Sequence, residues 1–127
     1  MTERYEELLS RLESGRLDPG DFGHRDHVGV AVVALRRYPF FEAVMIIARG
    51  IEAAALRTGA PDKFNATITL ASMSLIAERL ESWGDGPVDD FVGQNAELLA
   101  PSALMGLYGK ERMTSPLARR VALLPVG

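Results

Sequence analysis

Apolar residues recur along this chain at the three- and four-residue spacing of a helix face, almost from end to end. Side chains with this spacing lie on one side of an α-helix, so the pattern predicts amphipathic helices. Glycines and prolines interrupt the pattern and mark the turns between the segments. The pattern predicts five helices, over residues 3–13, 24–37, 40–58, 62–83 and 87–99.

The rest of the chain carries weaker helical signals. Residues 101–113 predict one or two short helical turns, and Ser115 is expected to cap a last short helix with Pro116 in its first position. The segment 62–83 is apolar almost all round, which is typical of a central, buried helix. β-Branched residues do not alternate with polar ones, so no sheet is expected. The sequence therefore predicts one all-α domain over residues 1–127, with five to six helices joined by short loops.

Composition and charge narrow the classes of function. Of the 127 residues, 47% are hydrophobic and 24% are charged, which is the balance of a globular chain. The net charge is −3, and two isolated arginine pairs make no basic patch, so we expect no nucleic-acid partner. The absence of cysteine excludes disulfides, thiolate metal sites and thiol catalysis. The N-terminal segment shows no signal-peptide pattern, and no apolar run approaches the ~20 residues of a membrane span. We therefore expect a cytoplasmic protein without a membrane partner.

Both histidines of the chain stand three residues apart at the start of the second predicted helix. His24 and His27 would share one helix face, and because histidine titrates near neutral pH either could transfer a proton. A metal site would need a third ligand, which only Asp or Glu could supply, and none has a diagnostic spacing. Asp26 points about 100° away on a helix and is a poor partner for either ring. Alternatively, Asp21 caps an ordinary helix start and the two imidazoles pack there.

A second group of polar residues lies on the apolar segment 62–83. Asn65, Thr69 and Ser72 share one helix face, and they could line a pocket. The alternative is that the hydroxyls bond back to the carbonyl groups one turn earlier, which is common in helices.

The C-terminal segment holds a third polar group. Tyr108, Glu111, Ser115 and Arg119 could donate or accept hydrogen bonds, although their spacing favours a solvated, capped helix. The chain contains no GxGxxG, GxxxxGK[ST] or GxSxG motif. Nucleotide cofactors and nucleophile-elbow hydrolases are therefore not expected.

These three groups resemble the segments of a group of small, all-helical, largely uncharacterised bacterial proteins. The group's segments read F-x-H-R-x-H-V, K-Y-H-x-T-x-T and Y-S-x-E-x-L-x-S-P-x-A-R, followed by V-x-P-D. The matching stretches here are FGHRDHV (22–28), KFNATIT (63–69) and YGKERMTSPLAR (108–119), followed by LLPVG. The resemblance covers residues 22–127 and leaves the first helix, within residues 1–14, outside. Some members of the group lie among natural-product biosynthesis genes, which implies such chemistry for this chain.

The resemblance also implies that the three segments converge on one pocket. The residues concerned are His24, His27, Asn65, Thr69, Tyr108, Glu111, Ser115 and Arg119. Two positions depart from the group, because its middle histidine is Asn65 here and its terminal acid is Val126. Asparagine is a weak metal ligand but a good hydrogen-bonding group, so we expect a polar pocket without a metal or another cofactor.

Three functions remain open. In the first, the chain is a small cofactor-independent enzyme. His24 or His27 transfers a proton during a condensation, cyclisation, dehydration or isomerisation, and the other six residues bind a small organic substrate. In the second, the chain binds a small ligand or a partner without catalysis, and its composition leaves a homodimer open. The third is a metal site of the two histidines and a carboxylate. The sequence favours the first and names no substrate.

Overall fold

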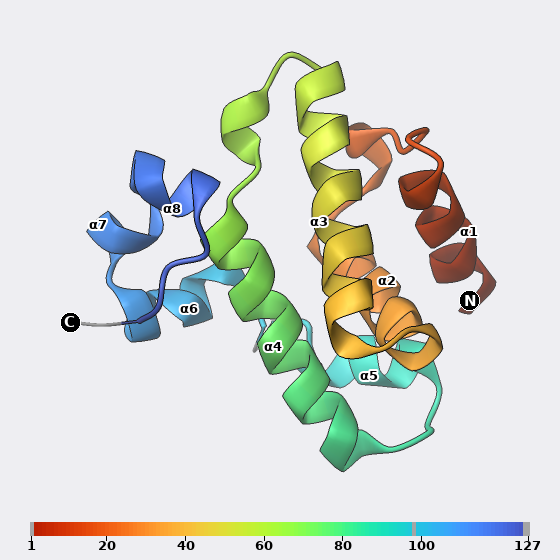
Figure 1. Cartoon of the computed structure of the whole chain (residues 1–127). Helices are drawn as coiled ribbons and strands as arrows, with labels where there is room; N and C mark the ends of the chain where they lie inside the picture. The colour runs from red at the N-terminus through yellow and green to blue at the C-terminus, as the bar shows by residue number, and fades with distance from the viewer. Residues whose placement is uncertain (1, 98, 126–127) are drawn as a thin grey trace.

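The computed structural model describes residues 2–97 and 99–125, and within them the chain forms helices and no strand (Figure 1). The five longer helices are α1 (Thr2–Glu13), α2 (His24–Arg37), α3 (Phe40–Arg57), α4 (Ala66–Trp83) and α5 (Val88–Asn95). The C-terminal part holds α6 (Pro101–Tyr108), α7 (Lys110–Met113) and α8 (Pro116–Arg120). Two 3-10 turns, η1 (Pro19–Asp21) and η2 (Pro61–Lys63), precede α2 and α4. Of the helices described, none is both long and apolar enough to cross a membrane.

The all-α class is confirmed, but the prediction of five to six helices is too low, since the described residues form eight α-helices. The segment 101–113 divides at Gly109, whose φ of +79° is a left-handed conformation that glycine adopts readily. The fourth helix begins only at Ala66, because Pro61–Lys63 form a separate turn and the side chain of Asn65 caps the α-helix. Helices of four to eight residues are too short to give a clear periodic pattern.

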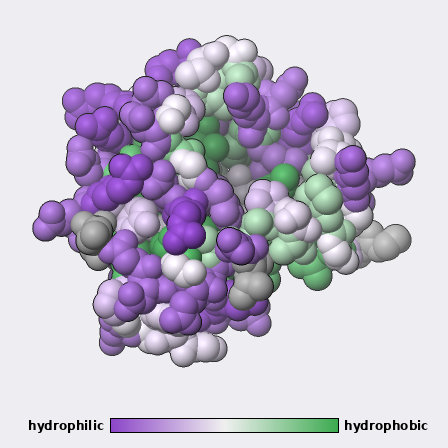
Figure 2. All heavy atoms as spheres, turned by 180° about the vertical axis from the view of Figure 1, so that it is seen from behind, coloured by the Kyte–Doolittle hydropathy of each residue, from purple (hydrophilic) through white to green (hydrophobic). Residues whose placement is uncertain are grey.

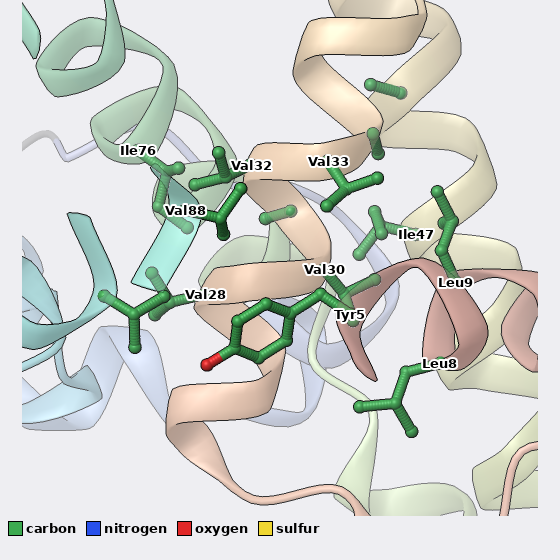
Figure 3. Close-up of a cluster of buried hydrophobic side chains, with 14 of the residues drawn as sticks. Tyr5, Leu8, Leu9, Val28, Val30, Val32, Val33, Ile47, Ile76 and Val88 are labelled. Atoms are coloured by element: carbon green, nitrogen blue, oxygen red, sulfur yellow. The ribbon is translucent and has the colours of Figure 1, made fainter. Parts of the chain in front are cut away.

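The central helix of the fold is α2. Seven consecutive residues, Val28–Ala34, are buried, so the middle of α2 is enclosed on every side (Figure 3). It packs against α1, α3, α4 and α5. The prediction that the segment 62–83 forms the central helix is wrong, because α4 leaves Ser74, Glu78 and Glu81 exposed. The buried residues of α2 are all Val, Ala or Gly, and their small size lets four helices approach one axis.

Two glycines set how closely α1 approaches its neighbours. A Cβ atom on Gly29 of α2 would overlap the ring of Tyr5, and one on Gly50 of α3 would overlap the side chain of Leu12. Tyr5 and Leu12 are both buried, so each side chain of α1 occupies the space that the glycine leaves open.

The C-terminal helices form a second layer against α4, on the side away from α1 (Figure 1). Leu104, Met113 and Ala118 are buried there, outside the main hydrophobic cluster. Seen from behind, apolar surface gathers on the side of these helices (Figure 2). The exposed apolar residues of this layer are Met105, Leu107, Leu117, Val121 and Leu124.

Replacing Gly50 by alanine tests the close approach of α1. We expect Gly50→Ala to lower the free energy of unfolding by about 1–3 kcal/mol, because the added methyl group meets the buried Leu12 side chain. The matched control is Gly106→Ala in α6, where a Cβ atom meets nothing within 4 Å. That control should be neutral or stabilise by up to about 1 kcal/mol. Urea unfolding measures both, and equal stability of the two variants would contradict the packing described.

Candidate functional site

The first predicted site surrounds His27, near the start of α2. Its ring lies against Phe22 with the centroids 5.6 Å apart, and its Nε2 atom is buried without a hydrogen-bond partner in the described part of the chain. Burial, and to a smaller extent the neighbouring His24, lower the pKa of His27 to about 4. His27 is therefore neutral near pH 7.

His24 lies at the surface and makes a structural bond. Its Nε2 atom is 2.7 Å from the carbonyl oxygen of Ala96. Because a carbonyl oxygen only accepts, Nε2 carries the hydrogen of this bond. Ala96 is the residue that ends α5, so the bond ties the first turn of α2 to the last turn of α5.

Asp26 closes the beginning of α2 and joins it to α1. Its Oδ2 atom accepts from the backbone N–H of Gly23 at 3.1 Å, and both carboxylate oxygens accept from Arg4 at 3.0 Å. Burial alone would raise the pKa of Asp26, but the bonds from Arg4 and Gly23 outweigh burial and leave this pKa below its ordinary value. None of these bonds involves an imidazole, as the sequence predicted. The prediction that Asp21 caps the helix is wrong, because α2 begins after Gly23 and uses Asp26.

The second predicted group anchors the C-terminal layer. Asn65 caps α4, because its Oδ1 atom accepts from the N–H of Ile68 at 2.9 Å. Its Nδ2 atom donates to the carbonyl oxygen of Met113 at 2.8 Å, at the end of α7. The hydroxyl of Thr69 donates to the carbonyl oxygen of Asn65, one turn earlier, as expected if Thr69 does not line a pocket. Asn65 and Thr69 thus hold backbone groups.

Thr67 is an anchor that the sequence reasoning missed. It is 1% exposed, and its Oγ1 atom lies 2.9 Å from the carbonyl oxygen of Ala118 and 2.8 Å from that of Val121. The same atom accepts from the N–H of Leu123 at 3.0 Å. The sequence does hold a signal for this role. Thr67 lies on the opposite face of the helix from Asn65, and a hydroxyl there indicates that this second face of α4 is also packed.

The third predicted group is spread over α6, α7 and α8. Ser115 caps α8 as predicted, because its Oγ accepts from the N–H three residues on at 3.1 Å. Arg119 lies 3.8 Å from the carboxylate of Asp62, a surface ion pair worth about 0–1 kcal/mol. Glu111 is exposed and Tyr108 is half-buried. Neither side chain forms a hydrogen bond or an ion pair with a described residue.

No hydrogen-bond network among the described residues is shared by all eight predicted residues. Hydrogen bonds connect Asn65 with α7 and Thr67 with α8, and none in the described chain connects this group with His24 or His27. None of the eight residues lines any of the five best-formed pockets of the described chain. The described residues also contain no group of three or more His, Asp or Glu able to hold a metal. Val126 lies outside the described residues.

A pocket of about 260 Å³ lies between the segment 17–22, the second half of α3 and η2. Its apolar lining consists of Leu17, Pro19, Phe22, Ile51, Ala54, Ala55 and Ala60. Its polar lining comes from Asp18, Thr58 and Lys63, which are all exposed. The pocket combines an apolar interior with a polar opening, as small-molecule sites commonly do.

The wall formed by residues 17–22 is held at both ends. Arg57 of α3 donates to the carbonyl oxygens of Gly15, at 2.6 Å, and Leu17. Leu17 is buried in the core, and Phe22 packs against the core from the other end of the segment. The pocket is therefore formed before any ligand arrives.

Comparison with known proteins gives no match: no family model fits the chain, and no curated protein and no solved structure matches it. The resemblance to the small all-helical group stays a prediction.

Two variants of Asn65 separate its cap from its bond to Met113. Asn65→Ala removes both, and we expect it to lower the free energy of unfolding by about 1–2 kcal/mol. Asn65→Asp keeps the accepting oxygen but has no hydrogen to donate to Met113, so the amides of α7 and α8 should exchange faster while those of α4 do not. Amide hydrogen exchange measures this, and unchanged protection of α7 and α8 in both variants would contradict the anchoring.

The lowered pKa of His27 predicts how the free energy of unfolding depends on pH. The pKa of His27 is near 6.5 in the unfolded chain and about 4 in the folded one, so the unfolded chain binds more protons between these values. The free energy of unfolding linked to neutral His27 should be fully present above pH 7. It should fall as the pH drops from 6.5 towards 4, by at most about 3 kcal/mol.

We expect His27→Leu to flatten this dependence, because leucine neither titrates nor requires a partner for a buried nitrogen. His24→Gln is the matched control and should keep most of the dependence, because burial, the larger cause of the lowered pKa of His27, remains. Urea unfolding between pH 4 and 8 gives the curves, and parallel curves for His27→Leu and the unmodified chain would refute the assignment. Asp26 adds a separate loss of stability below pH 4, because its pKa is lowered by folding.

Proposed function

We propose that this chain is a non-catalytic binding protein for a small amphipathic carboxylate, held in the pocket between residues 17–22, α3 and η2. The observation that carries the proposal is the combination of apolar walls with a lysine at the mouth. The apolar part of the ligand would lie inside, and its carboxylate would remain at the opening beside Lys63.

The size of the pocket limits the ligand. Its volume of about 260 Å³ is just below the roughly 300–1,000 Å³ that is usual for drug-sized ligands, so a short acyl chain suits it. Burying each CH₂ group against the apolar walls would contribute about 0.8 kcal/mol. Because Arg57 and Leu17 already hold the wall, little ordering would oppose binding.

Lys63 supplies the preference for an anion. The three ion pairs of the described residues involve neither of the chain's two lysines, so the ammonium of Lys63 is available. Asp18 also lines the pocket, and its carboxylate keeps its charge while its Oδ1 atom accepts from the N–H of Gly20 at 2.9 Å, so the carboxylate of the ligand must lie nearer to Lys63 than to Asp18. The hydroxyl of Thr58 donates to Ala54 at 2.9 Å and can still accept.

The geometry supports binding better than it supports the enzyme that uses His24 and His27. The Nε2 atom of His27 is buried and its imidazole is neutral near pH 7, and the Nε2 atom of His24 is bonded to Ala96. The pocket itself offers no histidine. Proton-transfer catalysis and a role in natural-product biosynthesis stay predictions of the sequence.

Titration with hexanoate, followed by the amide NMR signals of the chain, tests the proposal. We expect saturable shifts confined to residues 17–22 and 51–63. Hexan-1-ol should bind about tenfold more weakly, because it lacks the charge that pairs with Lys63. Lys63→Gln should remove this preference for hexanoate over the alcohol.

Lys110→Gln is the matched control, because Lys110 is the other lysine and lines none of the five pockets. It changes the net charge equally and should leave the preference intact. Shifts spread over the whole chain, no saturation, or an equal effect of both lysine variants would each overturn the proposal.

A further inference from the structure

A larger groove lies where α2 turns into α3 and the last turns of α4 pass beside them (Figure 1). Its volume is about 610 Å³. Leu35, Tyr38, Phe40 and Leu80 give it an apolar floor, and all four are only half-buried. The groove shares no lining residue with the pocket proposed above.

The rim of this groove is acidic. Glu78, Glu81 and Asp85 line it, are exposed, and form no ion pair with a described residue. The one cationic side chain in the lining is Arg36, whose guanidinium donates to the carbonyl oxygens of Gly84, at 2.9 Å, and Gly86, at 2.6 Å. We call Leu35, Tyr38, Phe40, Leu80, Glu78, Glu81 and Asp85 together the acidic groove.

Apolar surface continues from the acidic groove onto α3. Phe41 is 77% exposed, and its ring meets that of Phe40 edge to face with the centroids 5.2 Å apart. Met45, one turn further along α3, is 49% exposed. An aromatic ring this exposed beside an open groove is typical of a surface that binds another protein.

We propose that the acidic groove binds a basic amphipathic helix of a partner protein. The apolar face of that helix would cover Tyr38, Phe40 and Phe41, and its Lys or Arg residues would pair with the three rim carboxylates. This inference is independent of the proposed ligand pocket, because the two sites use different residues.

Charge complementarity argues for a basic partner over a second copy of the chain. The chain carries a net charge of −3, and its own basic helix, α8, is only five residues long. A contact between α8 of one copy and the groove of another would join two different surfaces and would build rings or open chains of molecules.

The test uses two synthetic helical peptides with leucines at i, i+3 and i+4 and either lysines or glutamates elsewhere. Fluorescence anisotropy should show saturable binding of the leucine–lysine peptide. The double variant Glu78→Lys with Glu81→Lys should weaken this binding by about tenfold or more. Phe41→Ser, at an exposed position that should tolerate it, should weaken it by about threefold or more.

The matched control is Glu3→Lys with Glu6→Lys on α1. These two residues have the same i, i+3 spacing, and their replacement changes the net charge by the same amount. It should leave binding within about twofold, because these residues lie outside the groove. Melting curves establish that each variant is folded.

Four results would each overturn the proposal. The leucine–lysine peptide does not bind, the leucine–glutamate peptide binds as well, or the control pair weakens binding as much as the groove pair does. The fourth is a chain that sediments as an oligomer and becomes monomeric with Phe41→Ser, which would make a second copy the occupant.

Discussion

Burial of α2 on every side is the constraint on which the rest of this structure depends. A helix whose buried residues are Val, Ala and Gly has no bulky side chain of its own to fill the space around it. Four other helices must therefore approach it closely, and Tyr5 of α1 fills the place left by Gly29. The same packing reaches the first turns of α2, where it buries the Nε2 atom of His27 and makes the charged form of this imidazole costly.

The second layer depends on hydrogen bonds more than on apolar area. Helices α6, α7 and α8 are short, and few of their residues are buried. Asn65 and Thr67 compensate by binding backbone groups of α7, α8 and the segment after them. A buried polar side chain needs a hydrogen-bond partner, and the last carbonyl groups of a helix need a donor. The bonds from Asn65 and Thr67 meet both needs at once.

Because these polar residues hold helices together, the two candidate sites, the apolar pocket and the acidic groove, are formed by other residues. His24, Asn65, Thr69 and Ser115, four of the polar side chains that stand out in the sequence, are engaged in helix caps and anchors. Lys63, Glu78 and Glu81 form no ion pair with a described residue and remain available to a ligand or partner. The apolar pocket forms where the segment 17–22 crosses α3, and the acidic groove forms where α2 turns into α3. Neither place carries a sequence motif, because each is assembled from segments far apart in the chain.

The sequence by itself determined the helical class and part of the local structure. The spacing of apolar residues was enough for the all-α class and for the bounds of α2, and the capping chemistry of Ser115 was enough for the start of α8. It also determined that Asp26 does not serve an imidazole, because neighbours on a helix point in different directions. Only the tertiary structure decided which helix is central, that Asn65 and Thr67 hold other helices, and that the Nε2 atom of His27 is buried. Those outcomes depend on which surfaces meet, and periodicity within one helix says that a face is buried but not what covers it.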